Sequence, residues 1–381
     1  MGILSVLRFF RKPNVKSLNR MEVSKKAFLS NYAVLRALRE DAAFFPVVKS
    51  NAYGHGIEGT VKVLSKTDCE AIAVDSFVEY QFVRKFSKKD ALVLGETHPE
   101  NYAAFDLART VFCIWNPETA ERLGKTGKVF RIHIFLNTGM NREGVREIGL
   151  DALLAVLAKY PNLSVEGVCS HLSSADETDF APTEKQIAAF RRCYARIEAA
   201  GHAPAFRHIG ASAGTLKIDD PFFNAVRPGI ALYGFNPLSA EDPSYANGAG
   251  LKPVMKIFST VTAVQEISTE EGVGYNLTHQ AEKGARIAAI PFGYFEGLDR
   301  RLSNKGTFLW KKRPLPLVGR VCMNLSMADA TGTDARVGDE ITVVSDDPKA
   351  PNGVENLARQ TGTIPYEILV RFPSNMRRDW K

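Results

Sequence analysis

The sequence predicts an α/β protein that has an N-terminal (β/α)8 TIM-like barrel and a C-terminal mostly-β domain. From about residue 21 to 240, short apolar strands alternate with amphipathic helical stretches such as residues 185–200. After about Gly250, strand-like runs are separated by Gly, Asn and Asp turns. A chain of 381 residues with 45% hydrophobic content can bury two cores of ordinary domain size.

Eight strand candidates support the barrel: residues 47–49, 71–74, 91–94, 110–114, 131–136, 165–170, 206–209 and 225–230. A doubly wound sheet is the alternative, but no G-x-G-x-x-G follows the first strand. Polar residues that follow barrel strands gather at one mouth. The residues in such positions are Lys49, Arg142, His171, Ser212 and Gly229.

The β domain is predicted from four runs, residues 254–264, 285–289, 316–321 and 340–344. The segment Pro237–Gly250 is rich in Pro, Ser, Asn and Gly and is typical of a domain boundary. We therefore expect an N-terminal arm at residues 1–20, the barrel at 21–245 and the β domain at 246–381.

Composition narrows the classes of partner. Lysine and arginine exceed aspartate and glutamate by 49 − 42 = 7, which could suit an anionic ligand, a membrane surface or nucleic acid. No basic stretch is interleaved with aromatic residues as in RNA-binding motifs, so a solvated basic surface is favoured over nucleic-acid binding. Five cysteines without a CxxC pair or metal-ligand spacing indicate reduced thiols in a cytoplasmic protein and no metal.

The N-terminus has only a short apolar run before Arg8 and no small-residue cleavage site, so we expect neither a signal peptide nor a membrane span. An amphipathic arm that touches a membrane or packs on the protein is the remaining hypothesis, and packing is favoured.

Lys49 is the most informative residue, because the apolar run 44–48 delivers it to a point where Ser50, Asn51 and Gly54 break the strand pattern. Desolvation at such a strand end favours the neutral amine, which can attack a carbonyl. A lysine that extends from the strand end into water is the alternative.

The segment V-V-K-S-N-A-Y-G-H-G, with Lys49 and Tyr53, resembles the cofactor-binding motif of the alanine racemase family. The resemblance implies that Lys49 binds pyridoxal 5'-phosphate covalently and that Tyr53 binds its phosphate. Further matching segments are R-P-G-I-A-L-Y-G, H-I-G-A-S-A-G and G-T-I-P-Y-E-I. They imply phosphate contacts from Ser212, from the N–H groups of Gly229 and Ile230, from Tyr366, and a contact of Arg227 with the pyridine nitrogen.

The same resemblance implies a catalytic pair, Lys49 and Tyr275, with the tyrosine of one subunit entering the barrel of its partner in a homodimer. His171, backed by Arg227, is the implied relay to the tyrosine, although by itself His171 could be a structural histidine. Arg142 and the N–H beside Met323 are implied to bind the substrate carboxylate. Tyr294 and Arg300 resemble residues of the family's substrate entrance.

Three positions depart from the family pattern. Phe135 replaces a lysine that many relatives carry as a carbamate, and Asn137 and Asn324 stand where aspartates are frequent. A bound anion or an amide hydrogen bond replaces the missing charges, or Arg142 is held differently.

The resemblance implies a racemase that interconverts L- and D-alanine and so supplies D-alanine for peptidoglycan. A racemase of different or broader specificity stays open. A basic amino-acid decarboxylase is suggested by Cys322 but disfavoured by Arg227, because decarboxylation gains from a protonated pyridine. A pyridoxal-phosphate carrier is the non-enzymatic alternative, and carriers of that type lack the second domain.

Overall fold

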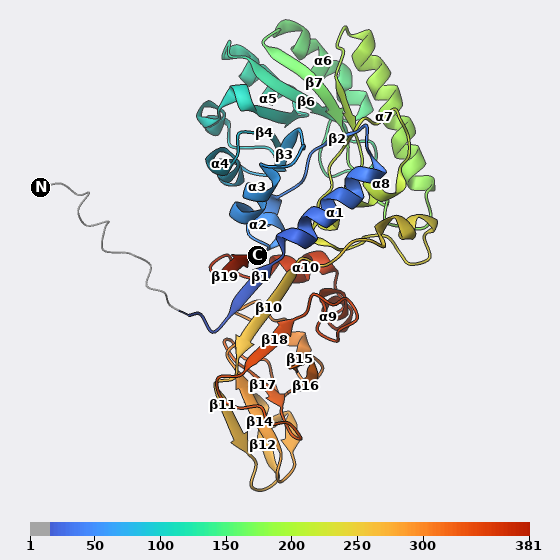
Figure 1. Ribbon diagram of the computed structural model, residues 1–381. Coiled ribbons are helices and arrows are strands. Elements are labelled where there is room, and N and C mark those ends of the chain that lie inside the picture. The colour runs from blue at the N-terminus through green and yellow to red at the C-terminus, as the bar shows by residue number, and fades with distance from the viewer. Residues whose placement is uncertain (1–15) are drawn as a thin grey trace, which may run out of the picture. The chain divides into compact units, whose positions relative to one another are not determined.

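The computed structural model describes residues 16–381, which form two compact units (Figure 1). The barrel unit comprises Ser24–Val254 with Trp380 and Lys381, and the β unit comprises Met255–Asp379 with the described residues up to Val23. The barrel unit begins at Ser24 rather than at the predicted residue 21, and it gives way to the β unit at Met255 rather than at residue 246. The reason is that β1 (Arg20–Val23) pairs with β10 (Met255–Thr260) and so belongs to the β unit. Most of the predicted N-terminal arm, residues 1–15, lies outside the described residues.

Eight parallel strands form the barrel. Six lie in one sheet in sequence order: β3 (Ala71–Val74), β4 (Asp90–Val93), β5 (Thr110–Ile114), β6 (Phe130–Phe135), β7 (Leu163–Cys169) and β8 (Phe206–His208). The other two, β2 (Ala43–Phe44) and β9 (Ala225–Val226), pair with each other. Backbone hydrogen bonds from Ala73 N to Pro46 O (2.8 Å) and from Arg227 N to Gly210 O (2.9 Å) join this pair to both edges of the sheet. The predicted (β/α)8 barrel is confirmed.

Helices connect these strands and cover the outside of the sheet (Figure 1). They are α1 (Lys25–Leu38), α3 (Ile57–Leu64), α4 (Phe77–Phe86), α5 (Pro117–Lys125), α6 (Leu150–Lys159), α7 (Ala181–Ala199) and α8 (Ser212–Lys217), whereas α2 (Lys49–Tyr53) is a short turn with left-handed φ angles. Serine hydroxyls cap two of them: Ser24 accepts from Ala27 N, and Ser76 accepts from Glu79 N.

The barrel interior is apolar, and every residue of β3 and β5 is buried. This burial on both faces is expected for a parallel sheet that is covered by helices. Phe45, Val111, Cys113, Phe135 and Cys169 belong to the interior cluster. Functional groups are therefore expected at the carboxyl ends of the strands, where the chain leaves this core.

The β unit is built on a nine-stranded sheet in the order β11-β14-β17-β16-β15-β18-β10-β1-β19, and the predicted mostly-β domain is confirmed. Its further strands are β11 (Ala263–Glu266), β14 (Arg286–Ile290), β15 (Thr307–Trp310), β16 (Arg313–Val318), β17 (Ser326–Asp329), β18 (Glu340–Val344) and β19 (Arg377–Trp380). A separate hairpin joins β12 (Glu271–Val273) and β13 (His279–Ala281), and the helices are α9 (Val354–Thr361) and α10 (Pro365–Val370). Among residues 16–381, no helix has the length and apolar character needed to cross a bilayer.

Candidate active site

Lys49 begins a left-handed turn rather than ending a strand. The predicted strand 47–49 is wrong in its position, because β2 lies at Ala43–Phe44 and Val47 makes only an isolated bridge to Ala73. Residues 50–53 then have φ angles of 54°, 54°, 55° and 51°, although none of them is glycine. Such a turn costs about 1–2 kcal/mol per residue, so the fold must hold it in place.

The Lys49 amine lies at the barrel mouth, 3.5 Å from Asp75 Oδ1. Its side chain is 37% exposed, so the strand end does not desolvate it as the sequence argument expected. The carboxylate of Asp75 is instead the charged neighbour that faces the amine.

Tyr53, Ser212 and Gly229 form a small polar cradle. Ser212 Oγ accepts hydrogen bonds from Gly229 N (2.9 Å) and Ala231 N (3.1 Å), which leaves its own hydrogen to donate. A Cβ atom on Gly229 would lie 2.3 Å from the hydroxyl oxygen of Tyr53, so a side chain at this position would displace the Tyr53 ring. Ile230 begins the 3-10 helix η5 (Ile230–Tyr233), where an N–H has no partner inside the helix.

Tyr233 supports the cradle from the barrel core. Its ring packs against that of Tyr53 at 5.1 Å and stacks on His55 at 4.5 Å. Its hydroxyl donates to Val47 O at 3.3 Å. The position of the Tyr53 ring is therefore set by a buried aromatic group.

Arg227 is buried just after β9, and its guanidinium is fixed by several acceptors. Nη1 donates to His208 Nδ1 (2.5 Å) and His208 O (3.0 Å), and Nη2 donates to Ser170 O (2.6 Å). Nη2 also lies 3.4 Å from His171 Nδ1. Burial lowers the pKa of Arg227, but a guanidinium keeps its proton at neutral pH.

Two buried histidines extend this network away from the mouth. Because arginine can only donate, His208 Nδ1 accepts, and its Nε2 donates to His133 Nδ1 at 2.8 Å. Burial lowers the pKa of both rings, that of His133 to about 3, so both are neutral. Sequence reasoning missed this pair, and the available signal was a histidine flanked by isoleucines in the run I-H-I of β6.

His171 is partly buried, and its ring lies beside Arg227. Burial, followed by the charges of Arg227, Arg142 and Lys49, lowers its pKa to about 3. The neutral imidazole is therefore favoured, and the Arg227 guanidinium is the cation that lies next to the ring, at 3.4 Å. Its Nδ1 faces Arg227 as an acceptor, so its hydrogen is on Nε2 and can be donated.

The substituted positions do not orient Arg142. Asn137 Oδ1 accepts from Gly139 N (3.2 Å) and Asn141 N (3.1 Å), so its amide stabilises its own loop. The Phe135 ring packs edge-on against Trp115 at 5.6 Å and forms an apolar wall. The half-exposed Arg142 side chain lies 3.6 Å from its neighbour Glu143.

The β unit carries the remaining predicted residues. Tyr275 follows Gly274, whose φ is 71°, and its side chain is 70% exposed. Met323 is 56% exposed, and its carbonyl accepts from Phe295 N at 2.9 Å. The Asn324 amide donates to Glu296 Oε1 at 3.0 Å.

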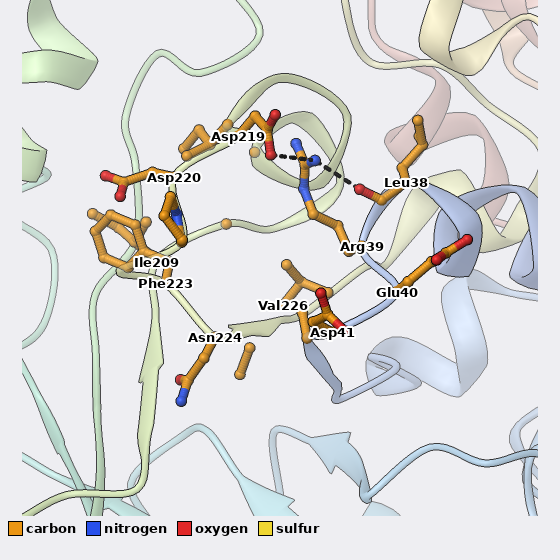
Figure 2. Close-up of a pocket in the computed structure, with 16 residues that line it drawn as sticks. Leu38, Arg39, Glu40, Asp41, Ile209, Asp219, Asp220, Phe223, Asn224 and Val226 are labelled. Carbon is orange, nitrogen blue, oxygen red and sulfur yellow. Dashed lines mark hydrogen bonds and ion pairs between the residues drawn. The ribbon is translucent and has the colours of Figure 1, made fainter.

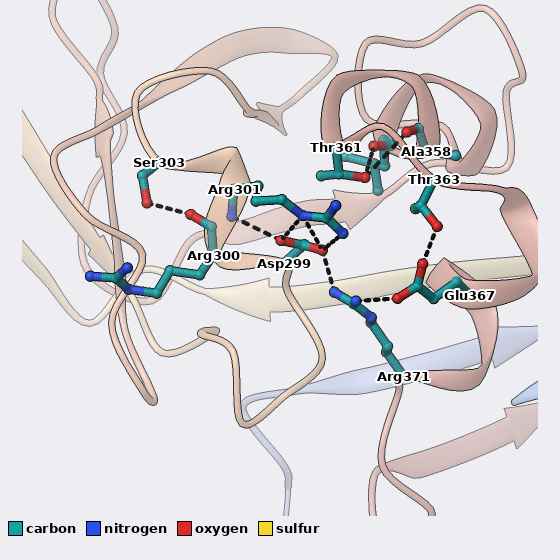
Figure 3. A network of polar contacts seen from close by, with 10 residues as sticks. Asp299, Arg300, Arg301, Ser303, Ala358, Thr361, Thr363, Glu367 and Arg371 are labelled. Atoms are coloured by element: carbon teal, nitrogen blue, oxygen red, sulfur yellow. Dashed lines mark hydrogen bonds and ion pairs between the residues drawn. The ribbon is translucent and has the colours of Figure 1, made fainter.

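A network of ion pairs around Asp299 lies next to Arg300 in the chain (Figure 3). Burial acts to raise the pKa of Asp299, but hydrogen bonds from Arg301 and the charge of Arg371 outweigh it and lower the pKa to about 2. Arg371 also binds Glu367 of α10, the helix of Tyr366. The network thus connects helix α10, which carries Tyr366, with the segment at Asp299 and Arg301.

Comparison with known families assigns both units. Residues 23–237 match the N-terminal domain of alanine racemase, and residues 254–380 match its C-terminal domain. The chain belongs to the alanine racemase family. Among its relatives, the alanine racemase of Sorangium cellulosum is 32% identical over 88% of this chain and 90% of its own. That of Geobacter sulfurreducens is 32% identical over 94% and 95%.

Solved alanine racemases have the same fold. The enzyme of Bacillus anthracis with bound L-Ala-P matches with a TM-score of 0.87 and 28% identity, over 96% of both chains. The biosynthetic enzyme of Pseudomonas aeruginosa matches with a TM-score of 0.82 and 30% identity, over 95% of this chain and 99% of its own.

Alanine racemases depend on pyridoxal 5'-phosphate, and the residues of the barrel unit fit that cofactor. A primary amine lies at the mouth, the Ser212 hydroxyl is free to donate, and Gly229 leaves room beside Tyr53. A fixed guanidinium suits a ring nitrogen that accepts a hydrogen bond. The donor set therefore matches an aldehyde, a phosphate and a pyridine nitrogen.

A different cavity of about 230 Å³ opens beside the end of α1 (Figure 2). Arg39 lines it and lies 3.4 Å from Asp219. None of the predicted site residues of the alanine racemase family lines this cavity, so it is separate from the candidate active site.

Proposed function

We propose that this protein is a pyridoxal 5'-phosphate-dependent alanine racemase that interconverts L- and D-alanine with Lys49 and Tyr275 as its two bases. The observation that carries the proposal is the match of both units to alanine racemase domains, together with the Lys49 amine, the Ser212 hydroxyl and the fixed Arg227 guanidinium in the barrel unit. Both units match alanine racemase domains, whereas a carrier made of a barrel alone would match only the first.

The cofactor, when bound, supplies an electron-withdrawing ring that stabilises negative charge at the α-carbon of the amino acid. Lys49 holds it covalently. The phosphate is bound by Tyr53, Ser212, Tyr366 and the N–H groups of Gly229 and Ile230. In the structure the Gly229 N–H donates to Ser212, so the Ser212 hydroxyl is the better supported donor of this group.

With the cofactor bound, Arg227 would donate a hydrogen bond to the pyridine nitrogen and so favour its unprotonated form. The weaker electron sink restrains transamination and decarboxylation and suits a proton that is removed from and returned to one carbon. The acceptors on His208 and Ser170 hold the guanidinium still.

Arg142 and the N–H beside Met323 bind the substrate carboxylate and place the α-carbon between the two bases. Lys49 moves the proton on one face and the Tyr275 hydroxyl moves it on the other. Neutral His171 donates from Nε2 to the tyrosine oxygen and so stabilises the phenolate without carrying charge itself.

The two bases come from different subunits of a homodimer in this proposal. Tyr275, Tyr294, Phe295 and Met323 are exposed apolar side chains of the β unit, and such a group suits burial against a second copy. A cytoplasmic enzyme that supplies D-alanine for peptidoglycan is the corresponding cellular role.

A racemisation assay in D2O tests the proposal, with the cofactor-loaded protein and alanine, serine, lysine and ornithine as substrates. We expect both alanine enantiomers to interconvert and to gain deuterium at the α-carbon. Faster turnover of serine or lysine would contradict the alanine preference. Release of carbon dioxide without α-deuterium would contradict the racemase.

A further inference from the structure

The left-handed turn at residues 50–53 is held by a carboxylate from another helix. Ser50 N donates to Glu79 Oε1 at 2.6 Å, and Asp75 N donates to Glu79 Oε2 at 2.9 Å. Glu79 therefore connects the turn that follows Lys49 with the backbone of Asp75. Asp75 is also the residue whose side chain faces the Lys49 amine.

The simpler explanation of Glu79 is that it caps its own helix. It lies in the first turn of α4, and its N–H donates to the Ser76 hydroxyl at 3.3 Å, as in a capping box. In that motif the glutamate side chain returns to the N–H of the capping residue, here Ser76. Instead, Glu79 Oε2 accepts a hydrogen bond from Asp75 N, and Oε1 accepts one from Ser50 N, which lies outside the helix.

The turn needs such a contact because its conformation is unfavourable for ordinary residues. Each of residues 50–53 has a positive φ without being glycine, and residues in this conformation persist only where their surroundings hold them. Within the turn, Asn51 Oδ1 accepts a hydrogen bond from Ile57 N at 2.9 Å, which connects the turn to the start of α3. At Ser50, the Glu79 carboxylate is the side chain that binds the backbone.

Relaxation of the turn would move the two residues that bracket it. Lys49 precedes the turn, and Tyr53 ends it with its hydroxyl beside Gly229. A return of four φ angles to the right-handed region would change the spacing between the Lys49 amine and the Tyr53 hydroxyl. Both groups contact the cofactor in the proposed function.

We propose that Glu79 is a positioning residue that holds this turn, and thereby Lys49 and Tyr53, in the geometry that binds pyridoxal 5'-phosphate. The inference rests on the proposed function for the identity of the ligand. It assigns to Glu79 a role beyond the helix cap.

The test compares Glu79→Gln with Ser76→Ala in the full chain. The cofactor dissociation constant is measured from the visible absorbance of the bound cofactor, and folding is measured from the midpoint of thermal unfolding. Glu79→Gln replaces one acceptor with an amide NH2 that faces an N–H, so we expect cofactor binding at least about tenfold weaker. Ser76→Ala removes the α4 cap but leaves Ser50 bound, so we expect a lower unfolding midpoint with wild-type cofactor affinity.

Cofactor affinity of Glu79→Gln within twofold of wild type would overturn the proposal, and so would an equal loss in Ser76→Ala. Glu79→Asp gives a second comparison if Glu79→Gln does not fold, because its shorter side chain cannot reach both N–H groups and we expect the same weakening. Racemisation by the wild type is measured in parallel. Its absence would contradict the proposed function, whereas the affinities decide the role of Glu79 separately.

Discussion

At the scale of single residues, the candidate site combines fixed cations with neutral histidines. His208 and the partly buried His171 contact Arg227, and His133 is buried behind His208; burial lowers the pKa of each ring. A protonated imidazole there would add a second charge beside the guanidinium. The site thus keeps Arg227 as its charged donor and uses the imidazoles as hydrogen-bond partners of defined tautomer.

The neutral histidines predict acid sensitivity. The unfolded chain has histidine pKa values of about 6.5, whereas those of His133 and His171 in the fold are about 3. The unfolded state therefore binds more protons below pH 6.5, and the free energy of unfolding falls as the pH drops from 6.5 towards 3. Each histidine contributes on the order of 1 kcal/mol per pH unit in this window.

Urea unfolding at pH 7.5, 6.5 and 5.5, with saturating cofactor, measures this slope. His171→Gln is the control. It removes the contribution of one histidine, so the free energy of unfolding should depend less steeply on pH. A free energy of unfolding that is the same at pH 7.5 and pH 5.5 would contradict the neutral histidines.

Sequence patterns found the residues that lie in recognisable motifs and missed those that support them. Lys49, Ser212 and Arg227 stand beside glycines and turn residues that are visible in the sequence. His133 lies between two isoleucines of β6 and shows no motif, because its partner His208 is distant in sequence and becomes a neighbour only when the barrel closes. Glu79 fits a local capping pattern, which conceals its contact with Ser50.

At the scale of elements, helix α8 links the cradle to a buried ion pair. Ser212 begins this helix and Lys217 ends it. The Lys217 amine pairs with Asp242 and donates to Glu177 O at 2.7 Å, and the two paired side chains are 9% and 0% exposed. The far end of the helix is therefore fixed to two other segments of the barrel unit.

Replacement of Asp242 by asparagine should destabilise the protein by about 3 kcal/mol, because the Lys217 charge would remain buried without its counter-ion. Chemical denaturation with and without cofactor measures this loss. Glu58→Gln is the matched control, since the exposed pair of Glu58 and Lys62 contributes no more than about 0.5 kcal/mol. An equal decrease in the free energy of unfolding of the two variants would contradict a larger contribution from the buried pair.

The strands were predictable where their apolar runs are continuous. Residues 71–74 and 110–114 are strands with the predicted bounds, because every side chain there is buried. The first strand was misplaced because the apolar run continues from Phe44 to Val48, whereas strand β2 ends at Phe44 and Val47 forms only an isolated bridge beyond it. The apolar run predicts that these residues are buried. It does not predict the left-handed turn that follows, because that turn depends on tertiary hydrogen bonds.

At the scale of the whole molecule, the proposed catalytic groups are divided between two units. Lys49, Arg142 and Arg227 belong to the barrel unit, whereas Tyr275 and Met323 belong to the β unit. The proposed homodimer brings the β unit of one copy to the barrel of the other. Each active site then uses both subunits.

Mixing two inactive variants tests that arrangement. Lys49→Ala and Tyr275→Phe each disable both sites of their own homodimer. A mixed dimer has one site with both bases intact, so random mixing should recover about a quarter of wild-type activity, since half of the dimers are mixed and half of their sites are intact. Mixtures that stay inactive while mass spectrometry detects mixed dimers would place both bases in one subunit.

The two-base assignment is tested most directly by Tyr275→Phe in D2O. The variant should bind the cofactor with unchanged visible absorbance and lose racemisation by about 100-fold or more, because the base on one face is missing. Lys49 should still exchange the α-hydrogen of a single enantiomer with solvent deuterium, without inversion. Inversion near the wild-type rate, or exchange of both enantiomers alike, would contradict the assignment of Lys49 and Tyr275 to opposite faces.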